Sequence, residues 1–261
     1  MTFAQVVETC LAEIKNAGSS LIYCLGAGDT GKSTLAMELA RQLARGGKKL
    51  AIIDADSGQS SRLPLTLSLN YVRSEFSHPA ELELADWAFM SSYDLLEQFE
   101  CYMELMKNWT RKTKNQMDCC IVDSNGDIRT LLKARELEIL NPDLLITLQR
   151  ESELEAILKS SGSRILRLPV PEEVKSKSWE LRRITRNDKF KRYFKDSGAQ
   201  VVKCKAPPFF DFVHRIVGLY SQGRFLGLGI AEDKKGSMLV VRSPIASVAD
   251  KVEFSSVKFE D

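Results

Sequence analysis

Two spacings of apolar residues alternate along the chain: short unbroken runs, and longer stretches in which apolar residues recur every three or four positions. Unbroken runs of about five apolar residues are typical of buried strands, and the longer spacing is typical of helices with one buried face. Strands are therefore predicted at 21–25, 50–54, 119–123, 144–148 and 164–168. Helices are predicted at 3–14, 35–43, about 80–108, 131–140, 152–159 and, with a strongly basic composition, 174–197.

This alternation predicts an α/β fold in which a parallel sheet is covered by helices on both faces. Right-handed crossovers then place the loops that follow the strands along one edge of the sheet. The pattern changes after about residue 200, where Pro207 and Pro208 precede apolar runs that are interrupted by glycine. The predicted division is a main domain over 1–200 and a small β-rich C-terminal domain over 201–261.

The loop between the first strand and the next helix carries a phosphate-binding motif. Residues 26–33 match G-x-x-x-x-G-K-[ST] at every fixed position, with a strand before them and a helix after them. In such a P-loop, backbone N–H groups close around phosphate oxygens, the lysine reaches the outer phosphates, and the next hydroxyl ligates Mg²⁺. The alternative is a glycine-rich turn that only resembles the motif. The residues expected to hold a nucleotide are Gly26, Ala27, Gly28, Asp29, Thr30, Gly31, Lys32, Ser33 and Thr34.

Three carboxylates follow strands that lead to the same edge of the predicted sheet. Asp54 and Asp56 come at the end of the second strand, and Asp123 ends the third. A carboxylate at this edge can hold Mg²⁺ through water, and another can accept a proton from an attacking hydroxyl. The alternative is a simple turn, in which Asp56 and Gly58 are common turn residues.

The segment 171–205 is basic, with eleven Lys and Arg against five Asp and Glu, in a chain whose net charge is only +2. Arg182 and Arg186 are four positions apart and share a helix face, with Arg183 beside them. Arginines on a mobile segment can neutralise the charge of a phosphoryl group in transfer. The alternative is a basic helix that is simply solvated.

Composition excludes several classes of protein. With 44% hydrophobic and 28% charged residues, the 261-residue chain is neither disordered nor a membrane protein, since it has no long uninterrupted apolar stretch. Six cysteines without a C-x-x-C pair, and no export signal at the N-terminus, predict free thiols in the cytoplasm. Neither of the two histidines lies near a cysteine at the spacing of metal ligands, which argues against a zinc site.

Taken together, the motifs resemble the polynucleotide 5′-hydroxyl kinase family, which includes the kinase subunit of the pre-mRNA cleavage machinery and ribosomal-RNA-processing kinases. Besides the P-loop, residues 54–59 read DADSGQ and are similar to the family's D-x-D-x-G-Q signature. The stretch 141–154 resembles the segment after its third strand. Residues 179–186 with Tyr193 and Phe194 resemble its arginine lid, here placed at 174–197.

The resemblance implies a P-loop NTPase-type kinase that transfers the γ-phosphate of ATP, or of GTP, to the 5′-hydroxyl of RNA or DNA with Mg²⁺. It implies that Asp56 is the base, that Lys32 acts on the phosphates, and that Gln59 and Asp127 contact the substrate. By the same resemblance the metal is held by Ser33, Asp54 and Asp123. The lid arginines are Arg182, Arg183 and Arg186.

Two departures from the family are visible. Residues 124–127 read SNGD where many members have T-x-G-W, so Asp127 replaces a tryptophan that stacks on substrate bases, and the substrate must be clamped differently. The larger eukaryotic members carry an N-terminal β domain that helps to hold the nucleotide base. Here about 20 residues precede the P-loop unit, so the choice between ATP and GTP stays open.

Three other functions stay open beside this kinase activity. One is a nucleotide-driven switch, although Ala27 stands where partitioning ATPases carry a further lysine and no N-K-x-D guanine motif is present. A non-catalytic ATP-binding scaffold and a small-molecule kinase are the others. No protein partner can be named from the sequence.

Overall fold

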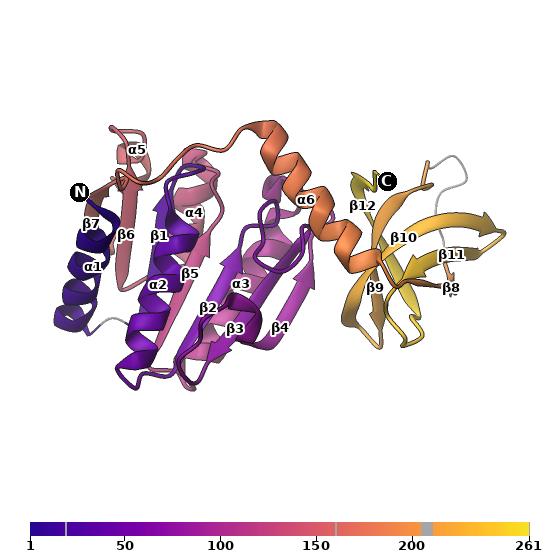
Figure 1. Cartoon of the computed structure of the whole chain (residues 1–261), viewed down its shortest axis with the longest axis horizontal. Coiled ribbons are helices and arrows are strands. Elements are labelled where there is room, and N and C mark those ends of the chain that lie inside the picture. Colours follow the sequence, from indigo (N-terminus) through magenta and orange to yellow (C-terminus); the bar gives the residue numbers. More distant parts are fainter. Residues whose placement is uncertain (19, 160, 205–210, 261) are drawn as a thin grey trace.

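The computed structural model describes residues 1–18, 20–159, 161–204 and 211–260, which form two sheets joined by a long helix (Figure 1). The larger sheet has the order β4-β3-β2-β5-β1-β6-β7. The strands β2, β5, β1, β6 and β7 pair in parallel, whereas β3 is antiparallel to both of its neighbours, β2 and the edge strand β4. The strands are β1 (Leu21–Gly26), β2 (Leu50–Ala55), β3 (Thr66–Val72), β4 (Glu83–Phe89), β5 (Cys119–Ser124), β6 (Leu144–Gln149) and β7 (Arg164–Pro169).

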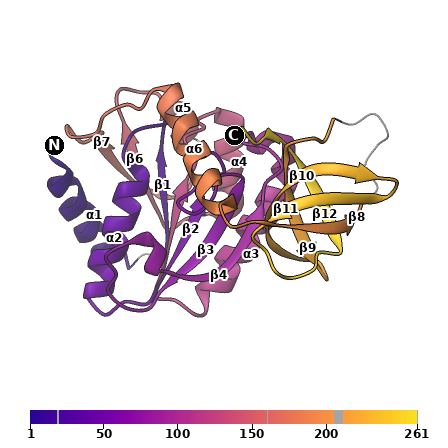
Figure 2. The ribbon, with the colours of Figure 1, turned by 45° about the vertical axis from the view of Figure 1, so that its right-hand side comes forward.

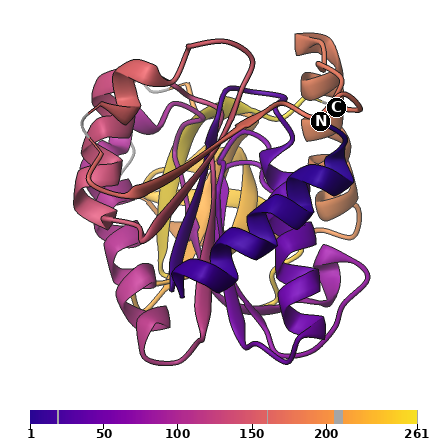
Figure 3. The same ribbon diagram turned by 90° about the vertical axis from the view of Figure 1, so that its left-hand side faces the viewer.

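Helices cover both faces of this sheet (Figure 3). One face packs against α1 (Phe3–Ala17) and α2 (Lys32–Arg45). The other packs against α3 (Phe99–Lys114), α4 (Thr130–Leu140) and the short α5 (Glu155–Leu158). Successive residues of a strand point to opposite faces, so the unbroken apolar runs of the central strands supply both cores. In β1, Ile22 joins the α1–α2 side and Tyr23 the α3–α4 side.

The smaller sheet is antiparallel, with the order β12-β9-β10-β11-β8. Its strands are β8 (Gly198–Lys203), β9 (Arg215–Ser221), β10 (Arg224–Lys235), β11 (Met238–Ser243) and β12 (Lys251–Lys258). Helix α6 (Trp179–Phe194) runs between the top of the large sheet and this small one (Figure 2). Pro207 and Pro208, which marked the predicted change of pattern, lie outside the described residues.

An apolar cluster joins the two sheets. Phe190 and Phe194 of α6 pack with Phe89 of β4 and with Ile216 and Phe225 of the small sheet. A Cβ atom at Gly218 of β9 would lie only 2.6 Å from the Phe89 ring, so a residue without a side chain is needed for this contact.

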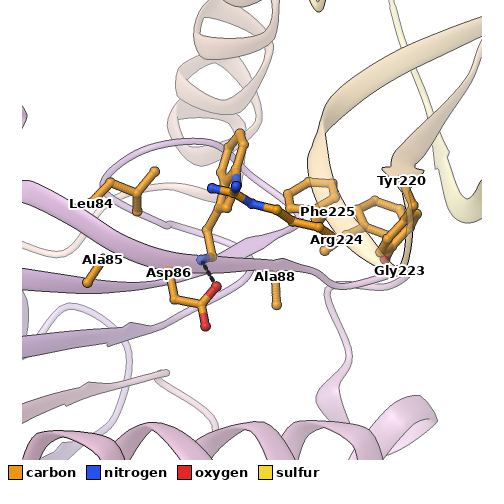
Figure 4. Close-up of a pocket in the computed structure, with 10 residues that line it drawn as sticks. Leu84, Ala85, Asp86, Ala88, Tyr220, Gly223, Arg224 and Phe225 are labelled. Carbon is orange, nitrogen blue, oxygen red and sulfur yellow. Dashed lines mark hydrogen bonds between the residues drawn. The ribbon is translucent and has the colours of Figure 1, made fainter. Parts of the chain in front are cut away.

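Beside this cluster lies a small pocket of about 280 Å³. It is lined by β4 and by the β9–β10 hairpin, from which Arg224 reaches toward β4 (Figure 4). The pocket therefore belongs to the junction of the two sheets.

The predicted α/β fold with a β-rich C-terminal part is confirmed. The prediction for residues 80–108 is wrong. The helix predicted over about 80–108 is split into the 3₁₀ turn η1 (Pro79–Glu81), strand β4, the 3₁₀ turn η2 (Leu95–Gln98) and α3. Strand β3 was not predicted, and its antiparallel pairing with both β2 and β4 makes the sheet mixed rather than purely parallel. Residues 83–89 include two alanines and a leucine and show little strand preference, so pairing with β3 decides their conformation.

Candidate functional site

The phosphate loop lies where the sequence predicts it, between β1 and α2. Gly31, with a left-handed φ of 90°, is the N-cap of α2. The helix begins directly after it, so the positive end of the helix dipole lies at the phosphate loop. The Lys32 Nζ atom donates a hydrogen bond to the Ala27 carbonyl oxygen at 2.7 Å. Burial lowers the pKa of Lys32, and the nearby Asp123 and Asp56 oppose this shift.

A cavity of about 1090 Å³ opens over this loop. Its walls come from segments that are far apart in the sequence. They include residues 28–34, the loops after β2 and β5, the segment 173–177 and one face of α6. Gly26 and Ala27 do not line it: Gly26 ends β1, and the Ala27 carbonyl is turned to Lys32 and Thr30. Topology thus gathers three of the predicted motifs around one space.

The carboxylates after β2 have different surroundings. Asp56 lines the cavity, and its Oδ1 atom accepts hydrogen bonds from the backbone N–H groups of Gly58 and Gln59 at 2.9 and 2.8 Å. Asp54 is buried, and its Oδ2 atom accepts hydrogen bonds from the Ser60 and Ser61 hydroxyls. Asp54 therefore supports the loop that positions Asp56.

Asp123 is the penultimate residue of β5 and lies beside Ser33. Burial, followed by the charge of Asp54, raises the pKa of Asp123 to about 7, and interactions with Ser33 and Lys32 oppose the shift. Its Oδ1 atom is buried and has no hydrogen-bond partner among the residues that the structure describes. Such an oxygen, beside the hydroxyl of the phosphate loop, is suited to hold water bound to a cation.

Helix α6 presents a basic face to the cavity. It begins after Ser178, whose hydroxyl accepts a hydrogen bond from the Leu181 N–H and caps the helix. The residues that face the cavity recur every three or four positions, and they are Arg182, Thr185, Arg186 and Lys189.

Arg183 is turned away from the cavity, although the sequence grouped it with its neighbours. It forms an ion pair with Glu260 at 2.9 Å and lies over the ring of Trp179. Adjacent residues of a helix are about 100° apart around its axis, and this rotation turns Arg183 toward Glu260 and Trp179 while Arg182 faces the cavity. The predicted set of three lid arginines is therefore divided by the structure into two that line the cavity and one that does not.

Both predicted substrate residues, Gln59 and Asp127, line the cavity. Arg129 donates hydrogen bonds to the Asp127 carboxylate and also pairs with Asp94. Although burial opposes it, this bonding holds the pKa of Asp127 below its usual value. Arg129 therefore compensates the negative charge of Asp127.

Two further cavity residues were not assigned a role from the sequence. Lys189 donates a hydrogen bond from Nζ to the Ser60 carbonyl oxygen, and its spacing from Arg182 and Arg186 is the signal that could have identified it. Tyr93 lies with its ring 4.8 Å from the Arg186 guanidinium carbon. It precedes η2, far from the other motifs, and no pattern in the sequence points to it.

Other sequence expectations concern metals, thiols and membranes. All six cysteines are free thiols, and only Cys101 is exposed. No three His, Cys, Asp or Glu side chains in the described ranges are grouped as a metal site. Across the part of the chain that the structure describes, no helix has the length and apolar character needed to span a membrane.

The chain is similar to known proteins in sequence and in fold. Residues 26–196 match the family model described as mRNA cleavage and polyadenylation factor CLP1 P-loop. The chain is 36% identical over 194 residues to polyribonucleotide 5′-hydroxyl-kinase MJ1315 of Methanocaldococcus jannaschii, an alignment that covers 72% of this chain and 54% of that protein. It is 34% identical over 192 residues to polyribonucleotide 5′-hydroxyl-kinase PH0197 of Pyrococcus horikoshii, covering 72% and 52%. The matched region thus spans about half the length of these relatives.

The fold is also similar to a solved structure. A chain of the wild-type Clp1p–Pcf11p (454–563) complex superposes with a TM-score of 0.76 and 13% sequence identity, covering 98% of this chain and 79% of that one. At this identity the likeness concerns the fold alone.

Proposed function

Because this chain belongs to the family described as mRNA cleavage and polyadenylation factor CLP1 P-loop, we propose that it is an ATP-dependent polynucleotide 5′-hydroxyl kinase. In this reaction the γ-phosphate of ATP passes to the 5′-hydroxyl of RNA or DNA. The observation that carries the proposal is the single cavity that holds the phosphate loop, Asp56 and the basic face of α6. A phosphoryl donor site, a proton acceptor and arginines are the parts that such a transfer requires.

On the donor side, we assign the phosphates of ATP to the phosphate loop and the N-terminus of α2. Lys32 balances charge on the outer phosphates, for which it leaves the Ala27 carbonyl. Arg182 and Arg186 approach from the lid and stabilise the charge that spreads over the γ-phosphate in the transition state. Arg183 has no part in this assignment.

The residues behind the loop fit a magnesium ion. Mg²⁺ is usually bound by one or two carboxylates, several waters and the phosphates of the substrate. Ser33 and Asp123 would hold it, and the unpartnered oxygen of Asp123 is the feature that fits. Asp54 is buried, and it would contribute to this site indirectly, by supporting the neighbouring loop. When bound, the ion supplies positive charge that offsets the charge of the phosphates.

On the acceptor side, we assign the base to Asp56. Its Oδ1 atom is fixed by two backbone N–H groups, while Oδ2 accepts no hydrogen bond from any residue that the structure describes. A carboxylate fixed in this way can orient a 5′-hydroxyl and take its proton late in the transfer. Gln59, Asp127, Tyr93 and Lys189 line the same cavity and would contact the nucleotide that carries the hydroxyl.

The proposal is tested by incubating the protein with γ-labelled ATP, Mg²⁺ and an RNA or DNA oligonucleotide with a 5′-hydroxyl end. We expect label on this oligonucleotide and none on the same oligonucleotide with a 5′-phosphate. ATP hydrolysis without transfer would replace the kinase with a nucleotide-driven switch. Binding of ATP without either reaction would indicate a scaffold, and transfer only to free nucleosides would indicate a small-molecule kinase.

A further inference from the structure

The side chain of Asp29 joins the phosphate loop to the segment that leads into α6. Its Oδ2 atom accepts hydrogen bonds from the Lys177 backbone N–H at 2.8 Å and from Arg182 Nη2 at 2.6 Å. Its carbonyl oxygen accepts a hydrogen bond from Arg150 Nη2 at 2.7 Å. One residue of the loop thus contacts the start of the lid twice through its carboxylate.

The backbone of Asp29 is left-handed, with a φ of 56°. Few residues other than glycine adopt this conformation, and Asp and Asn tolerate it best. Although burial opposes it, the hydrogen bonds from Lys177 and Arg182 hold the pKa of Asp29 below its usual value. The carboxylate is therefore charged at neutral pH, in a loop that binds phosphate.

The guanidinium of Arg182 lies directly against the loop. A Cβ atom at Gly28 would lie 2.9 Å from Arg182 Nη2, and a Cβ atom at Gly126 would lie 2.8 Å from the Gly28 backbone on another side. Gly28 is therefore enclosed between the lid arginine and the loop after β5. Removal of the ion pair with Asp29 would leave this arginine to be held by the helix alone.

A carboxylate beside bound phosphates repels them unless a positive charge compensates it. Arg182 supplies that charge only while the N-terminal end of α6 lies over the loop. A ligand shifts an equilibrium toward the state that it binds better, so a triphosphate favours the closed lid over an open one.

We infer that Asp29 is a positioning residue: its ion pair with Arg182 holds the N-terminal end of α6 over the phosphate loop and makes lid closure a condition of tight nucleotide binding. The inference rests on the proposed function only for the binding of ATP, and it does not depend on which molecule accepts the phosphoryl group. It assigns to the Asp29 side chain a role beyond the phosphate contacts of the loop backbone.

The first test is hydrogen exchange of the backbone amides of residues 179–186 without nucleotide. Asp29→Asn removes the charge but keeps the side-chain shape, the tolerance of the left-handed backbone and an oxygen for the Lys177 N–H. We expect exchange to be faster by roughly 5- to 150-fold, the usual range for coupling between sites. Glu260→Gln is the matched control, because it breaks the other ion pair of the same helix end, with Arg183, and leaves the loop intact.

The second test measures ATP affinity by calorimetry in Asp29→Asn, Arg182→Gln and the double variant. Without Arg182 the carboxylate loses its ion pair and keeps only the weaker influence of the Lys177 charge, so Asp29→Asn should strengthen ATP binding at least about fivefold in the Arg182→Gln background. It should change the affinity by less than that in the wild-type background. Arg182→Gln probes the pair from the helix side, which covers the case in which the loop variant fails to fold.

Equal exchange rates in Asp29→Asn and wild type would overturn the inference. So would an affinity change of the same size and sign in both backgrounds, because Asp29 would then act independently of Arg182. Neither measurement uses an oligonucleotide. Failure of phosphoryl transfer in the wild-type protein would therefore reject the proposed kinase activity while these two measurements still decide the role of Asp29.

Discussion

The two ends of α6 are held by different interactions. At its N-terminal end, Arg182 pairs with Asp29 and Arg183 with Glu260, and all four side chains are partly exposed. At its C-terminal end, Phe190 and Phe194 are buried against the small sheet. Exposed ion pairs contribute about 0–1 kcal/mol, whereas truncation of a buried Phe costs about 3–5 kcal/mol.

This difference indicates that α6 is anchored at its C-terminal end only. The anchored end fixes its position relative to the small sheet, and the polar end is free to respond to charge in the cavity. Substitutions at the cavity should therefore change the chemistry and leave stability intact, and substitutions at the anchor should do the reverse. Four variants test this separation, beginning with the largest expected effect.

Lys32→Ala should abolish phosphoryl transfer. Lys32 lies in the cavity and balances phosphate charge, which water does less well in a closed site. The denaturant midpoint should stay that of the wild type, since the side chain has one hydrogen bond, to Ala27. Transfer of labelled phosphate and urea unfolding measure the two effects, and wild-type turnover would contradict the nucleotide-dependent mechanism.

Asp56→Asn should lower the transfer rate by roughly 10²- to 10⁴-fold, the usual range for loss of a general base. The amide keeps the shape and an oxygen for the N–H groups of Gly58 and Gln59 but cannot take the proton. ATP affinity should change little, as calorimetry would show. Loss of ATP binding instead would make Asp56 a metal or structural residue and move the base to Asp54 or Asp123.

Phe194→Ala should lower the free energy of unfolding by about 3–5 kcal/mol, because it leaves a cavity in the apolar cluster at the anchor. Lys195→Ala, at the next and exposed position, is the control and should stay within about 0.5 kcal/mol of wild type. Urea unfolding measures both. A similar small change in both variants would show that the helix is not anchored by its aromatic residues.

Arg186→Ala should lower kcat by about 10²- to 10³-fold, the typical loss of one group that stabilises the transition state, with less effect on ATP affinity. Arg183→Ala is its matched control, and its kcat should stay close to that of the wild type because Arg183 pairs with Glu260 outside the cavity. Equal losses of kcat in both variants would mean that the helix rotates when substrate binds.

Local patterns were sufficient for most of the large sheet. The apolar runs of β1, β2, β5 and β6 are buried on both faces, and such strands are recognisable without knowledge of their neighbours. The apolar run of β7, at the edge of the sheet, is only partly buried. Strand β3 was missed because Ser68 and Asn70 interrupt its apolar pattern. Both are buried, and Asn70 accepts hydrogen bonds from Arg62, so the strand depends on partners remote from its own pattern.

The candidate site also has parts that follow from local patterns and parts that depend on remote partners. The sequence by itself determined the phosphate loop, Asp56 and the basic helix, because each depends on a short motif with fixed spacing and on the rule that loops after parallel strands meet at one edge. The tertiary structure alone decided that Arg183 faces Glu260 and that Asp29 holds Arg182. These pairs join residues 77 and 153 positions apart. Local spacing fixes which residues share a helix face, but the packing of the whole chain decides what that face meets.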